Sequence, residues 1–250
     1  VCTQMTPRWT CGEPTREEVR STLGGPLDGV LQERMVLAEG GLVRAPAHLT
    51  DEEAATLPCA GLTAWSALAG VRAGDTVLVQ GTGGVAIFAL QFARLLGARV
   101  LATTGRAERE EHLRELGADA VVNYREQPEW GAKIRDLAGG RGVDLVVEVG
   151  GAGTLEQSLR AVRLGGTIAL IGVLAGNAAA INLTSIFMQA VTIRGVLVGH
   201  REGFERMNRA IALHGLRPVV DRTYPWTEAR AALEAMAAGE HFGKICLRFE

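Results

Sequence analysis

Short apolar runs alternate along most of the chain with longer segments in which apolar residues recur every three or four positions. Apolar runs that lack an alternating polar residue are typical of strands covered on both faces of a parallel sheet. They predict strands at the following positions: 76–80, 99–103, 120–123, 144–149, 166–171 and 192–198. Helical spacing predicts the intervening helices: 85–96, 108–116, 129–137 and a stripe of Leu155, Leu159 and Val162. This order predicts an α/β fold built on a Rossmann doubly wound parallel sheet.

The pattern differs on either side of this region. Residues 1–26 predict irregular structure with a short helix at 15–23, and two β-like runs follow at 30–36 and 41–44. Thr50 and Glu53 form a capping box that begins a helical stretch, which Pro58 interrupts. After residue 198 the expected elements are helices at 204–213 and 228–238, the second capped by Thr227, and extended runs at 219–224 and 244–249.

A glycine-rich loop directly follows the first predicted strand of the alternating region. The loop consists of Gly81, Thr82, Gly83, Gly84 and Val85, and Ala86 completes the spacing G-x-G-x-x-A. Closely spaced glycines let the backbone approach a pyrophosphate, and the N-terminus of the following helix offers free N–H groups and a positive dipole end. The loop therefore predicts a dinucleotide-binding site.

Composition narrows the function classes. The chain has 250 residues, 47% of them hydrophobic and 22% charged, and a formal net charge of −2. These values indicate a globular protein and favour neither nucleic acid nor a membrane surface as a partner. The four cysteines form no C-x-x-C pair, and no apolar run reaches the length of a membrane span, so we expect a reducing, cytoplasmic location. The start at Val1, within loop-like sequence, indicates a piece of a longer protein.

The end of the second strand indicates which dinucleotide binds. NAD-binding domains place an acidic residue about 20 residues beyond the glycines, where it accepts hydrogen bonds from the ribose. Here Thr104 occupies that place, and Arg106 and Arg109 follow within a turn. Arginine can bind the 2′-phosphate of NADP through paired N–H donors, so we predict NADP rather than NAD. Both arginines are also compatible with ordinary solvated positions on a helix surface.

Several further motifs accompany the glycine-rich loop. They are Leu57 to Trp65 (LPCAGLTAW), Gly24 to Gly29 (GGPLDG), Val122 to Glu126 (VNYRE), Val149 to Gly151 (VGG), Leu170 to Val173 (LIGV) and Gly243 to Ile245 (GKI). With these motifs the chain resembles the medium-chain dehydrogenase/reductase superfamily over essentially its whole length. It is most similar to the zinc-type alcohol dehydrogenase-like and NADPH:quinone oxidoreductase-like branch.

The resemblance implies a domain organisation. Members begin with a GroES-like β-domain, of which about the first quarter of the family length is absent from this sequence. Residues 1–49 would be the remainder of that substrate domain, 50–198 the Rossmann dinucleotide-binding domain, and 199–250 a return to the substrate domain. The active cleft would lie between the two domains.

The resemblance also implies further cofactor contacts. A basic residue at the position of Arg109 and the tyrosine at Tyr124 lie beside the 2′-phosphate in the quinone reductase relatives. Gly150, Ile171 to Val173 and Val196 to Val198 would offer backbone groups to the ribose and carboxamide, and Thr63 matches a threonine beside the nicotinamide ring. The apolar side chains at these positions equally fit packing at the ends of strands.

Cys59 leaves two interpretations open. In zinc alcohol dehydrogenases, a cysteine four residues before this threonine is one of three catalytic zinc ligands, and the other two would come from the part that this chain lacks. The alternative, which we favour, is a small buried cysteine packed on a helix, without zinc. Glu148, at the end of the fourth strand, receives no role beyond that of a solvated or hydrogen-bonded structural acid.

We therefore expect an NAD(P)-dependent oxidoreductase, NADP(H)-preferring, that transfers a hydride between nicotinamide and a carbonyl, quinone, activated alkene or alcohol. The alternatives are a zinc-dependent alcohol dehydrogenase that uses Cys59, and a non-catalytic NADP-binding fragment. The edge strand 192–198 is rich in β-branched residues, and relatives pair this edge across a two-fold axis, so we expect a homodimer through it.

Overall fold

The computed structural model describes residues 1–249 and divides into two compact units. The terminal unit comprises Val1–Ser66 and Val198–Glu250, and the sheet unit comprises Ala67–Leu197. Residues 50–66, which the family resemblance assigned to the dinucleotide-binding domain, group with the terminal unit. The Sγ of Cys2 lies 3.4 Å from the carbonyl oxygen of Ala54, and Arg217 forms a 2.8 Å ion pair with Glu53. These contacts tie the segment to both chain ends.

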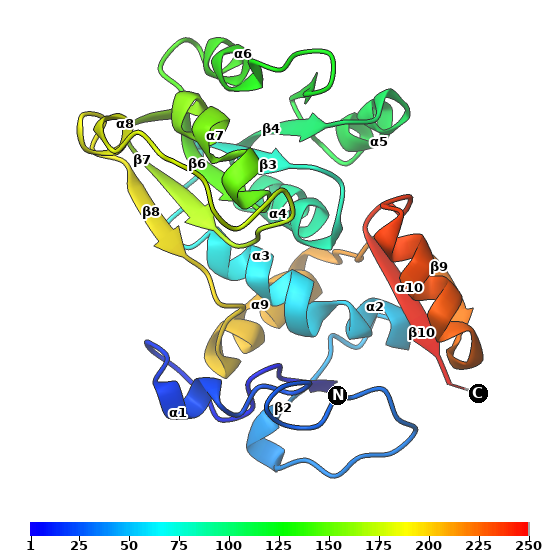
Figure 1. Ribbon diagram of the computed structural model, residues 1–250. Helices are drawn as coiled ribbons and strands as arrows, with labels where there is room; N and C mark the ends of the chain where they lie inside the picture. The colour runs from blue at the N-terminus through cyan, green and yellow to red at the C-terminus, as the bar shows by residue number, and fades with distance from the viewer. Residues whose placement is uncertain (250) are drawn as a thin grey trace. The chain divides into compact units, whose positions relative to one another are not determined.

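The sheet unit contains one six-stranded, entirely parallel sheet (Figure 1). Its order is β5-β4-β3-β6-β7-β8, so successive strands are added outward on both sides of the central β3–β6 pair. This is the strand order of the Rossmann fold, and it confirms the predicted fold class. The strands are β3 (Thr76–Gln80), β4 (Arg99–Thr104), β5 (Ala120–Asn123), β6 (Val143–Glu148), β7 (Val162–Leu170) and β8 (Thr192–Gly195).

Helices connect these strands, as the apolar periodicity predicts. They are α4 (Gly84–Leu95), the 3-10 turn η3 (Ala107–Arg109), α5 (Glu110–Glu115), α6 (Trp130–Leu137), the turn η4 (Gly151–Gly153), α7 (Leu155–Ala161) and α8 (Thr184–Phe187). Val162, which we predicted in the helical stripe, instead begins β7. Gly97 ends the turn after α4 with φ +81°, a value that favours glycine.

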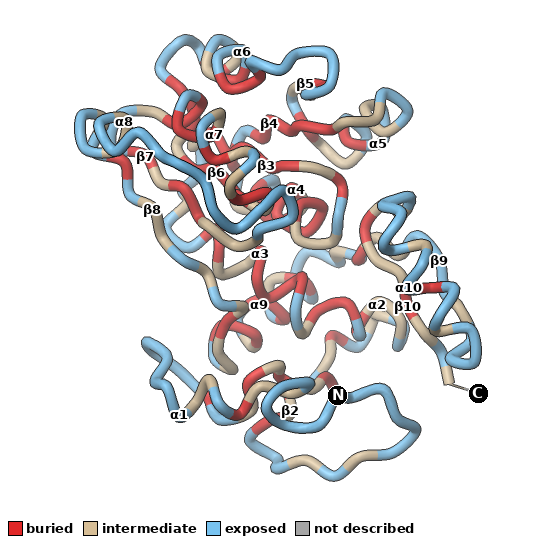
Figure 2. Tube along the Cα trace, viewed as in Figure 1, coloured by how far each residue is buried: buried red, intermediate tan, exposed pale blue. Residues whose placement is uncertain are grey.

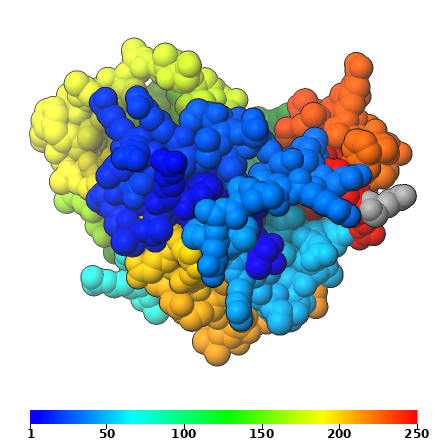
Figure 3. Space-filling model, turned by 90° about the horizontal axis from the view of Figure 1, so that it is seen from below, coloured from blue at the N-terminus to red at the C-terminus, as the bar shows by residue number. Residues whose placement is uncertain are grey.

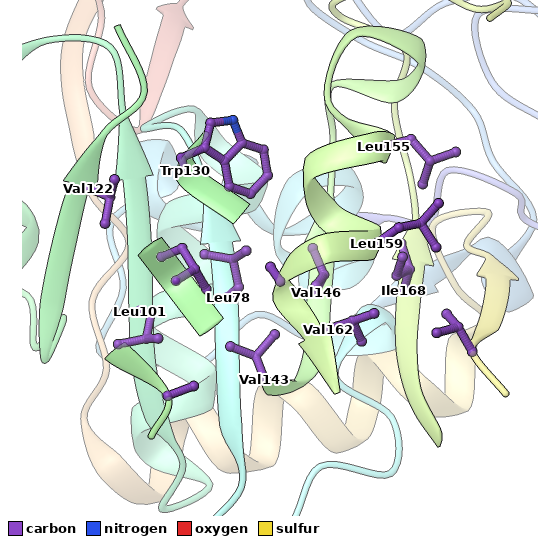
Figure 4. Packing of buried hydrophobic residues seen from close by; sticks show 14 residues of the cluster. Leu78, Leu101, Val122, Trp130, Val143, Val146, Leu155, Leu159, Val162 and Ile168 are labelled. Atoms are coloured by element: carbon purple, nitrogen blue, oxygen red, sulfur yellow. The ribbon is translucent and has the colours of Figure 1, made fainter. Parts of the chain in front are cut away.

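The core of the sheet unit lies on both faces of β3, β4 and β6, whose traces are almost wholly buried in Figure 2. On one face, Trp130 from α6 and Leu155 and Leu159 from α7 pack over Leu78 and Val146 (Figure 4). Leu78 and Val146 are both fully buried. Burial of a large aliphatic side chain contributes about 1.5–3 kcal/mol, so this face contributes strongly to the stability of the unit.

Asp144 organises the amino end of β6. Its carboxylate, whose side chain is 9% exposed, accepts hydrogen bonds from the Thr76 amide at 2.8 Å and from Arg163 and Arg141 at 2.6 Å each. Burial on its own raises the pKa of Asp144, but these three donors outweigh it and leave the pKa below its ordinary value. The carboxylate thus links β3, β6 and β7 at the end of the sheet opposite the glycine-rich loop.

The terminal unit is built from short elements. They are β1 (Cys2–Thr3), α1 (Arg16–Val19), the turn η1 (Glu39–Gly41), β2 (Leu42–Val43), α2 (Asp51–Ala55), the π-helix η2 (Leu57–Gly61), α3 (Leu62–Ala67, whose last residue lies in the sheet unit), α9 (Arg201–His214), β9 (Val220–Pro225), the turn η5 (Trp226–Glu228), α10 (Ala229–Ala237) and β10 (Lys244–Arg248). β1 pairs antiparallel with β2, and β9 pairs parallel with β10. The beginning of the chain lies against α9: the amide of Arg201 donates to the Trp9 carbonyl at 3.1 Å, and Figure 3 shows the dark blue start beside the yellow-orange helix.

Local sequence signals in this unit are only partly confirmed. The Thr50–Glu53 capping box is present, with both of its hydrogen bonds. The strand predicted at 30–36 is wrong: that segment has no strand, and Val36 is 99% exposed. Thr227 does not cap α10, because the 3-10 turn η5 includes it and Glu228 is the N-cap residue. Pro58 does not break the helix, because it sits in the first turn of η2, where its missing N–H is tolerated.

No helix within residues 1–249 is both long enough and apolar enough to cross a membrane.

Candidate functional site

The predicted cofactor contacts within the sheet unit follow the carboxyl ends of its strands. The glycine-rich loop follows β3, Arg106 follows β4, Tyr124 follows β5 and Gly150 follows β6. The carboxyl ends of parallel strands lie at the same end of a sheet. These segments are far apart in the sequence, but they therefore lie together at the carboxyl end of this sheet. A cavity of about 460 Å³ lies elsewhere, between α7 and residues 179–189, and none of the predicted site residues lines it.

The glycine-rich loop leaves open space for a ligand. Gly81 has φ +78°, and a Cβ added at Gly81 or Gly83 would meet no atom within 4 Å. Gly83 is the N-cap residue of α4 and no side chain caps that helix, whose first N–H groups have no intrahelical partner. The loop and the helix end therefore fit a pyrophosphate, which would accept those N–H groups.

Arg109 reaches back from η3 to the glycine-rich loop. Its Nη1 donates to the Oγ1 of Thr82 at 2.6 Å, and the Thr82 side chain is buried. Arg106, whose side chain is 36% exposed, forms a loose ion pair with Glu108 at 3.7 Å. Of the two predicted basic residues, Arg109 therefore contacts the glycine-rich loop, and Arg106 is paired with a neighbouring acid.

Thr104 and Tyr124 complete this corner of the site. The Thr104 side chain is 2% exposed, and its Oγ1 accepts the backbone N–H of Arg106 at 3.2 Å, so the hydroxyl fixes the turn that presents Arg106. The Tyr124 ring packs on Gly105, where an added Cβ would lie 2.5 Å from the ring, and the residue is 42% exposed. No sequence signal indicated that Gly105 makes room for the tyrosine.

Glu148 is the most buried ionisable residue at this edge, with no exposed surface. Its Oε1 accepts the amides of Gly150 and Gly151 at 2.8 and 3.0 Å and the Thr154 hydroxyl at 2.6 Å. Its Oε2 accepts the Gln80 amide at 2.9 Å and the Ser158 hydroxyl. Of the two predicted forms of a structural acid, the hydrogen-bonded one is therefore present and the solvated one is wrong. The prediction missed that this carboxylate joins the end of β3 to the loop after β6.

The segments after β6 and β7 are packed closely together. Backbone hydrogen bonds run from Ile171 to the Glu148 carbonyl at 2.8 Å and from Ala175 to the Gly150 carbonyl at 2.7 Å. A Cβ added at Gly151 would lie 2.6 Å from the Gly176 carbonyl oxygen. Ile171 is half-buried, and Val173 is 58% exposed. These two loops therefore form one hydrogen-bonded layer, in which both predicted nicotinamide-side segments take part.

The predicted contacts at Val196 and Val198 fall on either side of the unit boundary. In the sheet unit, Val196 extends the edge beyond β8 by donating to the Leu170 carbonyl at 2.9 Å. In the terminal unit, Val198 has φ +43°, which is strained for a β-branched residue. Such strained residues cluster at ligand sites and hinges. β8 itself ends at Gly195, three residues earlier than predicted.

Thr63 and Cys59 belong to the terminal unit. Thr63 is 4% exposed in the first turn of α3. Cys59 is exposed, so the predicted burial is wrong: it lines a groove of about 520 Å³, together with Cys2, Met35 and Lys244. No group of three or more His, Cys, Asp or Glu side chains that could hold a metal occurs in residues 1–249. Cys59 alone cannot complete a zinc site, because a catalytic zinc needs three protein ligands.

Comparison with known proteins decides the family. Residues 84–213 match the zinc-binding dehydrogenase family. A zinc-type alcohol dehydrogenase-like protein of Schizosaccharomyces pombe is 40% identical over 259 aligned residues, which cover all of this chain and 75% of that protein. The chain belongs to the zinc-binding dehydrogenase family. The predicted membership of the medium-chain dehydrogenase/reductase superfamily is thereby confirmed.

Two solved structures that bear on the cofactor are similar to this chain. An NAD-dependent alcohol dehydrogenase superposes with a TM-score of 0.87 at 33% identity, covering 98% of this chain and 74% of the other. A mycobacterial protein complexed with NADPH superposes with a TM-score of 0.74 at 31% identity, covering 82% of this chain and 68% of the other. The chain is thus a member of a family of NAD(P)-dependent oxidoreductases. Both cofactors occur among its relatives, so the choice between them depends on the side chains of this site.

Proposed function

We propose that this chain binds NADP(H) in preference to NAD(H), in a protein that transfers a hydride between nicotinamide and a carbonyl, quinone or activated alkene, or oxidises an alcohol in the reverse direction. The observation that carries the proposal is the corner after β4. Thr104 stands where an NAD-binding domain has its acid, and Arg109 lies against the glycine-rich loop. A carboxylate there would repel a 2′-phosphate, whereas a guanidinium attracts it.

Residues of this chain would hold each part of the cofactor. The free N–H groups at the start of α4 would bind the pyrophosphate, and Arg106, Arg109 and Tyr124 would surround the 2′-phosphate. Backbone groups of Gly150, the 171–173 segment and the 196–198 segment would meet the ribose and carboxamide. The bound nicotinamide supplies the hydride acceptor or donor, while the protein orients it and excludes water.

The test has two parts, binding and turnover. Fluorescence titration of the chain should give a lower Kd for NADPH than for NADH, and equal or reversed affinities would contradict the proposed preference. NADPH oxidation is then assayed against a quinone, an enone and an aldehyde panel. Turnover supports the oxidoreductase, whereas tight binding without turnover supports the alternative of a cofactor-binding chain without catalysis.

The exposure of Cys59 supports a second candidate, a zinc-dependent alcohol dehydrogenase. A thiol at the surface of a groove is accessible to a metal and to ligands from another segment, which a buried thiol is not. Elemental analysis of the protein with and without Cys59→Ser distinguishes the candidates. One tightly bound zinc per chain that is lost in the variant would favour the second, and no bound zinc in either protein would favour the first.

We also propose that two copies pair through β8. This strand forms one edge of the sheet (Figure 1). Exposed apolar side chains occur in the segments just before it in the chain. Leu174, Phe187 and Met188 are 87%, 66% and 67% exposed. An unpaired edge beside such side chains is a liability that pairing removes. Light scattering should show a dimer that Phe187→Asp dissociates, while Leu213→Asp, at an exposed leucine of the terminal unit, should remain dimeric; a monomeric wild type would contradict the proposal.

A further inference from the structure

The carboxylate of Glu148 contacts the loop after β6 and the last residue of β3, which directly precedes the glycine-rich loop. On one side it accepts the amides of Gly150 and Gly151, and Thr154 adds a third hydrogen bond to the same oxygen. Three donors on one oxygen determine where the start of this loop lies relative to the end of β6. The loop has two consecutive glycines, whose backbone is otherwise the most permissive of any residue.

The other oxygen, Oε2, bonds to the residue that precedes the glycine-rich loop. It accepts the Gln80 side chain at 2.9 Å, and Gln80 is the last residue of β3, directly before Gly81. Ser158 of α7 donates to the same oxygen and accepts from Gln80 at 2.7 Å, which closes a ring of three hydrogen bonds. The carboxylate is therefore the link between the end of β3 and the loop after β6.

We propose that Glu148 is a positioning residue that holds the glycine-rich loop and the Gly150–Gly151 loop in the relative placement that a dinucleotide needs. This inference rests on the proposed function, that is, on the binding of a nicotinamide dinucleotide by these loops. Glu148 has no exposed surface and touches no cofactor itself; it acts through the backbone amides and Gln80. The same residue also bonds the third loop, because its carbonyl accepts the Ile171 amide at 2.8 Å.

The hydrogen-bond partners of Glu148 fit a scaffold. The five side-chain contacts of Glu148 come from two amides, two hydroxyls and one carboxamide, and all five groups donate to it. All five bonds end on a side chain that has no exposed surface. Removal of the carboxylate would leave the amides of Gly150 and Gly151 buried without this acceptor, so the loop would move to reach water or other partners.

The environment also offers a conservative variant that preserves the link. The Oε1 of Gln80 is buried and has no hydrogen-bond partner. In Glu148→Gln the new carbonyl can keep the Gly150 and Gly151 amides, while Gln80 rotates its carboxamide so that Oε1 accepts the new NH2 group. Glu148→Ala has no such compensation.

Binding of whole and half cofactors tests the inference. The probes are NADPH, NADH and 2′-AMP, which carries only the adenosine 2′-phosphate part; each Kd is measured on the folded chain. For Glu148→Ala we expect NADPH and NADH to bind at least about tenfold more weakly, with 2′-AMP unchanged, because only the whole dinucleotide spans both loops. Glu148→Gln should restore both dinucleotides to within about threefold of wild type.

Asp144→Asn is the matched control, because it alters another buried carboxylate of β6 at the opposite end of the strand. It should lower the melting temperature and leave all three affinities unchanged. If Glu148→Ala does not fold, Gln80→Met takes its place, because it cuts only the link to β3, and the same pattern is expected at smaller amplitude.

Each outcome separates the two proposals. Unchanged dinucleotide affinity in folded Glu148→Ala, or in Gln80→Met where the first variant fails, would overturn the positioning role while the proposed function stands. If the variant lost affinity for 2′-AMP by the same factor as for the dinucleotides, the positioning role would also be overturned, since that result would indicate a general loss of structure. Wild-type protein that binds neither dinucleotide would remove the proposed function and this inference together.

Discussion

Arg109→Gln is expected to convert the proposed NADPH preference into near indifference between the two cofactors. Arg109 is half-buried, and its Nη1 already donates to Thr82 at 2.6 Å, so its guanidinium is held at the glycine-rich loop before any ligand arrives. Little side-chain entropy would then be lost when a 2′-phosphate binds. Glutamine keeps a polar side chain, although a shorter one, and removes the charge and the paired donors.

The magnitude follows from the position of each arginine. A hydrogen bond to a charged group contributes about 1.5–3 kcal/mol, and the partial exposure of Arg109 favours the lower end, which corresponds to roughly a tenfold rise in the Kd for NADPH. Arg106 has a side chain that is 36% exposed and pairs with Glu108 at 3.7 Å. Arg106→Gln should therefore raise the Kd for NADPH only about threefold, because an exposed ion pair contributes little binding free energy.

The assay is fluorescence titration of wild type and variants with NADPH and with NADH at low and high salt. The Kd for NADH should stay within about twofold in Arg109→Gln, and added salt should narrow the difference between NADPH and NADH in the wild type. Arg99→Gln removes the same charge from the other end of β4 and serves as the control. Thr82→Val removes the partner of Arg109 but not its charge, and separates loop placement from phosphate binding.

One result would refute the reasoning. If Arg109→Gln weakened NADH and NADPH by the same factor, Arg109 would act by supporting the glycine-rich loop, and the assignment of the 2′-phosphate to this corner would be wrong.

Two further predictions concern stability. Asp144→Asn should lower the free energy of unfolding by about 1–2 kcal/mol at pH 7, because a buried carboxylate loses its charge-assisted bonds. Because the pKa of Asp144 is lowered in the folded state, the stability that its carboxylate contributes is fully present above the unfolded pKa, about 3.9, and disappears as the pH falls through the folded pKa. Urea unfolding of wild type and variant from pH 7 down to pH 3 measures this loss. A difference in unfolding free energy between the two proteins that stays constant with pH would contradict it. Gly131→Ala should cost about 1–3 kcal/mol, because the new Cβ would lie 2.3 Å from the Gln157 carbonyl oxygen and α6 would have to move away from α7. Gly195→Ala, whose Cβ would meet nothing within 4 Å, should unfold at nearly the wild-type urea concentration, and equal losses in the two glycine variants would exclude the packing explanation.

Two strands of the sheet, one central and one at its edge, were predictable from sequence because the information that defines them is local. Thr76–Gln80 and Ala120–Asn123 were predicted with their observed bounds, and both are short apolar runs between turn residues. The outer strand β8 was predicted three residues too long, because a β-branched run continues beyond the point where β7 stops offering partners. Residues 30–36 have strand-like composition without a neighbouring strand to pair with, and they form none.

In the candidate site, too, features that are contiguous in the sequence were predictable, and contacts between distant residues were not. The glycine-rich loop and the missing acid at Thr104 are contiguous features that the order of residues alone reveals. The role of Glu148 was not visible, although an acid at the end of an apolar strand signals a buried partner. Its partner Gln80 is 68 positions away, and only the adjacency of β3 and β6 brings them together. The exposure of Cys59 was likewise missed, since helical spacing says nothing about what covers the helix.

The sequence by itself determined that the chain alternates strand and helix, that one turn is suited to a pyrophosphate, and that arginines rather than an acid follow the second strand. These properties depend on residues within a few positions of one another, where backbone preference and apolar periodicity act directly. Only the tertiary structure decided that Arg109 contacts Thr82 and that one buried carboxylate joins the end of β3 to the loop after β6. Parallel strands pair through long crossovers, so the contacts at their common edge depend on strand order, which no local pattern encodes.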